Sequence, residues 1–134
     1  MSNGLRVSTK AAERIQQVLQ RLLELSRADS VWLVSGFGRE IAVTGDVGAV
    51  DAAGFSSLVA SIDAAAQEAL SLLDGRGGRR WALLSSGHIC CLLAPVSEVG
   101  TLVFVSEPSR VSFLLQAGKA VPRIGHVLRD ILQQ

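Results

Sequence analysis

Three short segments in the second half of the chain are apolar at almost every position. They cover residues 81–84, 89–93 and 102–105. A strand with one face in water alternates apolar and polar side chains, so the loss of alternation indicates strands that are covered on both faces. A sheet buried in this way needs helices on each side. The remainder of the chain must therefore supply at least two helical layers.

Turn signals between the apolar segments predict hairpins and therefore antiparallel pairing. Gly36 and Gly38 stand between two short candidate strands and supply the positive φ that a tight turn needs. Ser86 and Gly87 stand between two others, where a two-residue turn would fit. The five predicted strands cover residues 31–35, 40–44, 80–85, 88–94 and 101–106.

Two segments in the first half of the chain have apolar residues at the three- and four-residue spacing of amphipathic helices. The first begins at Ser8 or Thr9, either of which can cap it, and continues to about Arg27. The second begins at Asp51 and continues to about Leu73. These helices stand before and after the first predicted hairpin.

A third helix follows Pro108, and Pro122 predicts a kink or break in it near residues 119–121. The order of elements is then α-β-β-α-β-β-β-α. We predict an α/β fold of the α+β type, with one five-stranded, mostly antiparallel sheet and helices on both faces. The length of 134 residues fits a single domain over residues 1–134.

Composition and charge argue against several classes of partner. Thirteen basic and twelve acidic residues give a net charge of +1, which provides no strong field for a nucleic-acid backbone or an anionic membrane. The aromatic residues include no Tyr, so base-stacking platforms are not expected. No apolar run reaches the roughly 20 residues that a membrane span needs, and residues 1–10 contain no apolar leader. We expect a cytoplasmic protein with no nucleic-acid partner and no membrane insertion.

Reactive side chains are few and are not grouped in a way that supports catalysis. His88 and His126 are the two histidines and fall on different predicted elements, and no motif for a metal or nucleotide cofactor occurs. Cys90 and Cys91 are adjacent on a predicted strand, so they point to opposite faces and fit as small core residues. A redox switch or a cysteine-based enzyme is the weaker alternative. The sequence predicts a protein that is not an enzyme and has no cofactor or metal.

Two glycine-rich segments resemble phosphate-binding loops only in part. Residues 75–80 follow a helix and lack the Gly-Lys-Ser/Thr ending of a P-loop. A turn beside a strand edge explains this segment, and contact with an anion or with RNA is the alternative. Gly36 and Gly38 begin a pattern similar to a dinucleotide-binding motif, but Ile41 stands where its last Gly belongs.

The second predicted helix and the strand after it have features of a self-association surface. Small residues recur on one side of the helix from Gly54 to Ala64, and this side either faces water or allows another helix to approach closely. The apolar strand over residues 81–84 would otherwise be an exposed sheet edge, and such edges are normally covered or paired. We therefore predict a homodimer whose interface contains Gly54, Ser57, Ser61, Arg80, Trp81 and Leu83.

The first hairpin and the order of elements resemble the Roadblock/dynein-light-chain family. The resemblance rests on VWLVSGFGREIA at residues 31–42, the Gly45-Asp46 exit, a long Ala/Leu-rich helix, three strands and a C-terminal helix. The family pattern at the hairpin is an apolar strand, a turn ending in Gly, and a second strand with Ile/Val-Ala. Two residues depart from the family: Phe37 lies where the turn is usually polar or charged, and Pro122 interrupts the last helix.

The resemblance implies a regulator or scaffold of a small GTPase. Family members form homodimers through the central helix and the following strand. Bacterial members commonly work with a small Ras-like GTPase. Those similar to the polarity-switch regulator of gliding bacteria stimulate GTP hydrolysis by ordering the GTPase's own residues, without inserting an arginine. Eukaryotic members are dynein light chains or scaffold subunits for Rag-type GTPases.

On this interpretation the central helix offers the GTPase-binding surface. Candidate contacts lie outside its apolar stripe, and three arginines after it are outside candidates for an arginine finger. The alternative is a profilin-like sensory module that holds a small ligand between sheet and helix. Such a pocket needs a few buried polar groups, and the strands offer few of them. The candidate contacts are Ser56, Asp63, Gln67 and Glu68, and the arginines are Arg76, Arg79 and Arg80.

Overall fold

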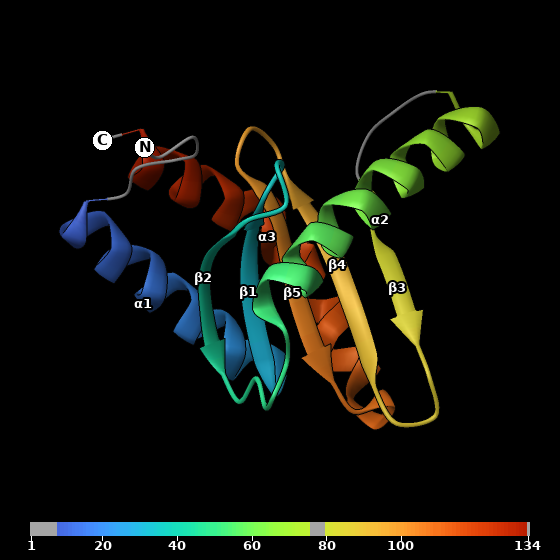
Figure 1. The fold of residues 1–134 in the computed structure, drawn as a ribbon, viewed down its shortest axis with the longest axis horizontal. Coiled ribbons are helices and arrows are strands. Elements are labelled where there is room, and N and C mark those ends of the chain that lie inside the picture. The colour runs from blue at the N-terminus through green and yellow to red at the C-terminus, as the bar shows by residue number, and fades with distance from the viewer. Residues whose placement is uncertain (1–7, 76–79, 134) are drawn as a thin grey trace.

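The computed structural model describes residues 8–75 and 80–133. Along these residues the elements follow the predicted order, and Figure 1 shows how they are arranged. They are α1 (Thr9–Ser26), β1 (Ser30–Ser35), β2 (Glu40–Gly45), α2 (Ala52–Leu73), β3 (Ala82–Ser85), β4 (Cys90–Val96), β5 (Gly100–Ser106), the short 3-10 helix η1 (Pro108–Arg110) and α3 (Val111–Leu132).

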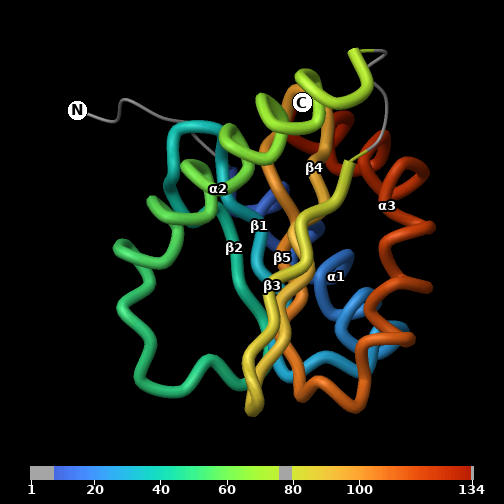
Figure 2. The backbone as a smooth tube through the Cα atoms, turned by 90° about the vertical axis from the view of Figure 1, so that its right-hand side faces the viewer, coloured from blue at the N-terminus to red at the C-terminus, as the bar shows by residue number. Residues whose placement is uncertain are grey.

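The five strands form one sheet in the order β2-β1-β5-β4-β3, and every neighbouring pair is antiparallel. Helices α1 and α3 lie together on one face of the sheet, and α2 crosses the other face alone (Figures 1 and 2). The predicted fold class, with helices on both faces, is therefore confirmed. One face has two covering helices and the other has one, so the two faces are not equally protected from water.

Caps at the helix starts agree with the sequence. The Ser8 hydroxyl accepts a hydrogen bond from the backbone N–H of Ala11 at 3.1 Å and begins α1. The Asp51 carboxylate accepts one from the N–H of Gly54 at 3.1 Å and begins α2. Each cap satisfies a backbone donor that the first helical turn leaves unpaired. Both predicted helix starts are confirmed.

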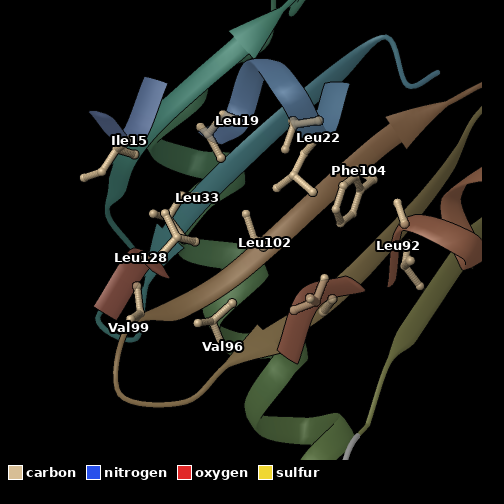
Figure 3. Packing of buried hydrophobic residues seen from close by; sticks show 14 of the residues in the cluster. Ile15, Leu19, Leu22, Leu33, Leu92, Val96, Val99, Leu102, Phe104 and Leu128 are labelled. Carbon is tan, nitrogen blue, oxygen red and sulfur yellow. The ribbon is translucent and has the colours of Figure 1, made fainter. Parts of the chain in front are cut away.

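The central strands divide the core into two clusters. The larger cluster lies between the sheet and the α1/α3 layer, and Figure 3 shows side chains from both helices meeting those of β1, β4 and β5. The smaller cluster lies beneath α2. Residues of β1, β4 and β5 alternate between the two clusters, so the predicted two-sided burial is confirmed for these strands. The smaller cluster contains Trp32, Val34, Val59, Cys91, Leu93 and Val103.

The edge strand β3 does not have the predicted two-sided burial. Three of its four residues are exposed, because no strand pairs with its outer side in this chain and the covering helices leave it partly open. The predicted two-residue turn after it is displaced by one residue. The N–H of Ser86 donates to the carbonyl of Ile89 at 2.8 Å, so Gly87 and His88 form the turn in place of Ser86 and Gly87. The Ser86 hydroxyl also accepts hydrogen bonds from the N–H groups of His88 and Ile89, both at 3.2 Å.

The predicted break in the last helix is wrong, because α3 continues through Pro122 from Val111 to Leu132. Proline removes one helical hydrogen bond, but the helix on both sides of it packs against the sheet, where Gly118 and Val121 are buried. Gly118 allows a close approach: a Cβ atom there would lie 3.2 Å from side-chain atoms of Leu92 and Trp81. Packing against the sheet therefore outweighs the local preference for a break.

Gly100 offers a test of the sheet geometry. It starts β5 with φ at +152°, and a Cβ atom there would collide with the backbone carbonyl oxygen of Val34. We predict that Gly100→Ala lowers the free energy of unfolding by roughly 2 kcal/mol or more, measured by denaturant titration. Gly36→Ala is the matched control, since nothing lies within 4 Å of its added Cβ. Equal stability of the two variants would contradict this assignment.

Candidate interaction surface

The helix α2 is poorly covered by the rest of the chain. Over its 22 residues, Ser56 and Val59 are the buried positions. Its C-terminal turns extend beyond β3 and past the edge of the sheet (Figure 1). Three leucines there, Leu70, Leu72 and Leu73, have exposed fractions of 40%, 84% and 84%. An exposed apolar group of this kind, on an element without a covering layer, indicates a contact surface.

The sheet edge beside α2 is also apolar and unpaired. Among the described strands, β3 pairs with β4 alone. The side chains of Trp81, Leu83 and Leu84 have exposed fractions of 37%, 46% and 43%. An unpaired edge presents a row of backbone donors and acceptors that a second strand can use. Two of the predicted dimer residues, Trp81 and Leu83, therefore lie at the edge of the sheet.

Arg80 joins this edge to α2. Its Nη2 atom donates to the Oδ2 atom of Asp63 and to the Oε1 atom of Gln67, both at 3.2 Å. The side chains of Arg80 and Asp63 are about four-fifths buried. Arg80, which the sequence places at the dimer interface, therefore bonds within its own protomer to Asp63 and Gln67, which the sequence predicts to contact the GTPase. These bonds use Nη2, and the buried Nε atom of Arg80 has no hydrogen-bond partner among the described residues. Arg76 and Arg79 lie outside the described residues.

The small residues on α2 have a partner inside the chain. Ser57 and Ser61 are exposed, Gly54 is partly buried, and the Ser61 hydroxyl donates to the Ser57 carbonyl at 3.3 Å. The β1–β2 turn packs on this part of the helix, because a Cβ atom on Gly38 would lie 3.1 Å from the Cα of Ser57. The small side chains on this side of α2 therefore let the β1–β2 turn approach the helix closely. Ser57 and Ser61 remain exposed to solvent.

Ser56 corrects one of the predicted contacts. It is fully buried on the sheet side of α2, and its hydroxyl has no hydrogen-bond partner within the described residues. The sequence placed it outside the apolar stripe because serine is polar. The diagonal path of α2 turns this position toward the sheet, so a docking protein cannot reach it. Glu68 and Gln67 are exposed, and Asp63 is partly exposed.

An apolar groove lies between α2 and the sheet, where the alternative prediction of a sensory module places its ligand. Its volume is about 550 Å³, and it lies beside the β3–β4 connection, at the opposite end of β3 from Arg80. Trp32 and Phe55 form its inner wall as an edge-to-face pair with ring centroids 4.9 Å apart. Leu84 and Ile89 line its outer side and are about half exposed. The one sequence signal for it is the apolar run that continues into this exposed hairpin.

A second, larger groove of about 810 Å³ lies at the opposite end of the sheet. Phe37, which departs from the family pattern, projects here with 87% of its side chain exposed. His126 is exposed as expected, and its Nδ1 atom lies 2.8 Å from Nη2 of Arg129. Arg129 also lies 4.0 Å from the Glu98 carboxylate. The groove therefore combines an exposed aromatic ring with charges of both signs.

The two cysteines are free and buried, on opposite faces of β4. Burial, with a smaller effect of the neighbouring Cys90, raises the pKa of the Cys91 thiol from 9.0 to about 12. A nucleophilic or metal-binding cysteine needs its thiolate, which this environment disfavours. Among the described residues, no group of three or more His, Cys, Asp or Glu side chains could hold a metal ion. The described helices include none that is long and apolar enough to cross a membrane.

Comparison with known proteins decides the fold. No protein-family model and no curated protein matches the chain. An MglB with a tetrameric arrangement aligns over 96% of this chain and 99% of its own, with a TM-score of 0.74 and 22% identity. The gliding protein MglB of Thermus thermophilus aligns over 94% of this chain and 98% of its own, with a TM-score of 0.73 and 21% identity. A Roadblock/LC7 domain of Streptomyces avermitilis aligns over 88% of this chain and 97% of its own, with a TM-score of 0.67 and 15% identity.

The chain has the Roadblock/LC7 fold. The predicted resemblance is confirmed at the level of structure, including the central helix followed by three strands. In this Roadblock fold, α2 and β3 form one continuous surface, because the Arg80 side chain ties them together. Among the exposed large apolar residues of the described chain, four lie on α2 and three lie at β3 or just before it, where the Trp81 ring faces Gly118 of α3. They are Leu58, Leu70, Leu72 and Leu73 on α2, and Trp81, Leu83 and Leu84 at β3.

The Cys91 thiol predicts a loss of stability at alkaline pH. Its pKa is higher in the folded protein than in the unfolded chain, so folding favours the protonated thiol. Stability from this group is present below about pH 9 and is lost as the pH rises toward about 12. Denaturant midpoints measured across this range should fall less in Cys91→Ala than in wild type. Cys90→Ala should retain most of the wild-type fall, and identical curves for all three would contradict the cause assigned.

Proposed function

We propose that this protein is a non-catalytic homodimer that binds a small Ras-like GTPase and stimulates its GTP hydrolysis. The observation that carries the proposal is the apolar surface of α2 and β3 that a single protomer leaves exposed. The Roadblock fold, shared with MglB proteins, supports the same class of role.

The proposed dimer pairs the two β3 strands. A twofold axis perpendicular to the sheet, beside β3, would join the two sheets edge to edge and invert one protomer relative to the other. The C-terminal turns of α2 extend past one end of β3, and the apolar groove lies at its other end (Figure 1). The axis exchanges these ends, so the leucines of each α2 would cover the groove of the partner. Apolar surfaces on both sides make this exchange favourable.

The same axis would place both α2 helices on one face, where they form the proposed GTPase-binding surface. Glu68 is exposed there, and Gln67 and Asp63 surround it while contacting Arg80. No described arginine projects from α2, so the described part of this surface has no arginine finger to insert. Stimulation would then come from ordering the GTPase's own switch loops, since positioning alone can supply rate.

The runner-up function is a sensory module that holds a small ligand. The apolar groove beneath α2 favours it, because Trp32 and Phe55 line a space large enough for such a molecule. The two functions compete for one site, since the partner's leucines would fill the groove in the proposed dimer. An apolar dye can test this function. Strong binding of the dye to the wild-type protein, with an affinity that does not change when the protein is diluted to the monomer, would favour the ligand function.

The dimer can be tested at its two apolar parts. Leu84→Asp should raise the dimer dissociation constant at least about tenfold, because it places a charge in the joined edge and the groove. Sedimentation velocity over the micromolar range measures this constant. Leu25→Asp is the control, since Leu25 is 57% exposed but lies on α1, at the other face of the sheet. A monomeric wild type, or equal effects of both substitutions, would reject the proposed interface.

The GTPase interaction can be tested with a purified small Ras-like GTPase. The GTPase loaded with a non-hydrolysable GTP analogue should bind the wild-type dimer more tightly than the GDP form does. Glu68→Ala should weaken that binding by about fivefold or more, because it removes an exposed charge from the docking face. Glu24→Ala, an exposed change on α1, should leave it unaltered. Equal binding of both nucleotide forms would overturn the proposal.

A further inference from the structure

Charge is distributed unevenly along the chain despite the net value of +1. Residues 40–75 contain six acidic side chains and no lysine or arginine. This segment forms β2, the following loop and α2, so it supplies the helix that crosses one face of the sheet. Within this segment, α2 and its flanking residues carry four of the six carboxylates, one of which pairs with Arg80, and β2 lies against α1. The α2 side of the described molecule is therefore acidic on balance. The acidic residues are Glu40, Asp46, Asp51, Asp63, Glu68 and Asp74.

The opposite face has the reverse charge. Helices α1 and α3, with the flanking Arg27 and Arg110, contain eight basic residues and three acidic ones. Arg110 lies 3.6 Å from Asp29 and Arg129 lies 4.0 Å from Glu98, so two of the eight pair with carboxylates of connecting loops. Five others are exposed, and these are Lys10, Arg21, Arg27, Lys119 and Arg123.

Exposed apolar side chains accompany these cations. Leu25 on α1 is 57% exposed, and Val127 on α3 is 44% exposed. Phe113, at the start of α3, is 36% exposed, and the Arg27 guanidinium carbon lies 4.5 Å from the centre of its ring. Cations that alternate with single aliphatic and aromatic side chains are typical of surfaces that meet lipid headgroups.

We propose that the α1/α3 face attaches the protein to an anionic lipid surface by electrostatic attraction. Charge complementarity selects this occupant, because the cations are spread over two helices that lie side by side, as on a surface that meets a layer of headgroups. A nucleic-acid backbone would leave Leu25 and Val127 in water. Attachment by this face turns the acidic α2 side away from the membrane, where a second partner can reach it.

The attachment does not depend on the proposed GTPase interaction. A dimer formed through β3 would place two α1/α3 faces on the same side of one continuous sheet. Each lysine or arginine near an anionic surface contributes about 1 kcal/mol, or about fivefold in affinity. Doubling the number of cations therefore strengthens binding without any new contact.

Vesicle sedimentation tests the proposal with the purified protein. The protein should pellet with vesicles of phosphatidylcholine containing about one-third phosphatidylglycerol, and should stay in solution with phosphatidylcholine alone. Raising the salt to about 0.5 M should release it, since screening shortens the range of the attraction. Pelleting with neither vesicle, or equally with both, would overturn the proposal.

Two double variants with the same net charge distinguish an effect of the α1/α3 face from an effect of the overall charge of the protein. Lys119→Gln with Arg123→Gln removes two exposed cations from α3, and should lower the vesicle partition coefficient by about tenfold or more. Ala49→Glu with Ala53→Glu adds two charges at exposed positions on the α2 side, and should change it less than about twofold. Equal losses in the two variants would contradict the assigned face. Circular dichroism confirms that both are folded.

Discussion

Burial of the three central strands on both faces is the constraint on which the rest of the molecule depends. Strands β1, β5 and β4 place alternate side chains in two separate clusters, so each face must have a helical cover. Two helices cover one face and a single helix, α2, covers the other. One helix cannot shield five strands, and the uncovered remainder is the apolar groove and the β3 edge. The apolar parts of the proposed dimer interface are thus a consequence of unequal cover.

Periodicity was enough to predict the elements, because local capping and apolar spacing act within a few residues. Ser8 and Asp51 begin helices as their side chains require, and Gly38, with φ at +82°, turns the first hairpin, whereas Gly36 does not have the positive φ expected of it. Predictions failed where distant contacts decide. Pro122 stays inside α3 because the helix packs on β4, and the buried position of Ser56 follows from the diagonal path of α2. Neither the packing nor the path is encoded in a short window.

The charge pattern shows what an average conceals. A net charge of +1 predicts weak electrostatic binding only if the two signs are mixed on every face. Here α2 and its flanking residues place four carboxylates on one side, with Arg80 paired to one of them, while α1 and α3 with Arg27 and Arg110 place eight basic and three acidic residues on the other. The sheet holds these sides apart, so their fields do not cancel at the surface, where a partner within a Debye length experiences them. The fold therefore converts a nearly neutral chain into a molecule with two differently charged faces.

Arg80 explains why the helix and the edge belong to one surface. It precedes β3 and reaches Asp63 and Gln67 on α2, so a shift of the helix relative to the edge would break both contacts. A partner that pairs with β3 consequently meets α2 in a fixed position. The protein therefore loses less conformational entropy when the two surfaces dock. The same contacts keep the cation away from solvent. In the fold, Arg80 links α2 to the start of β3 through Asp63 and Gln67.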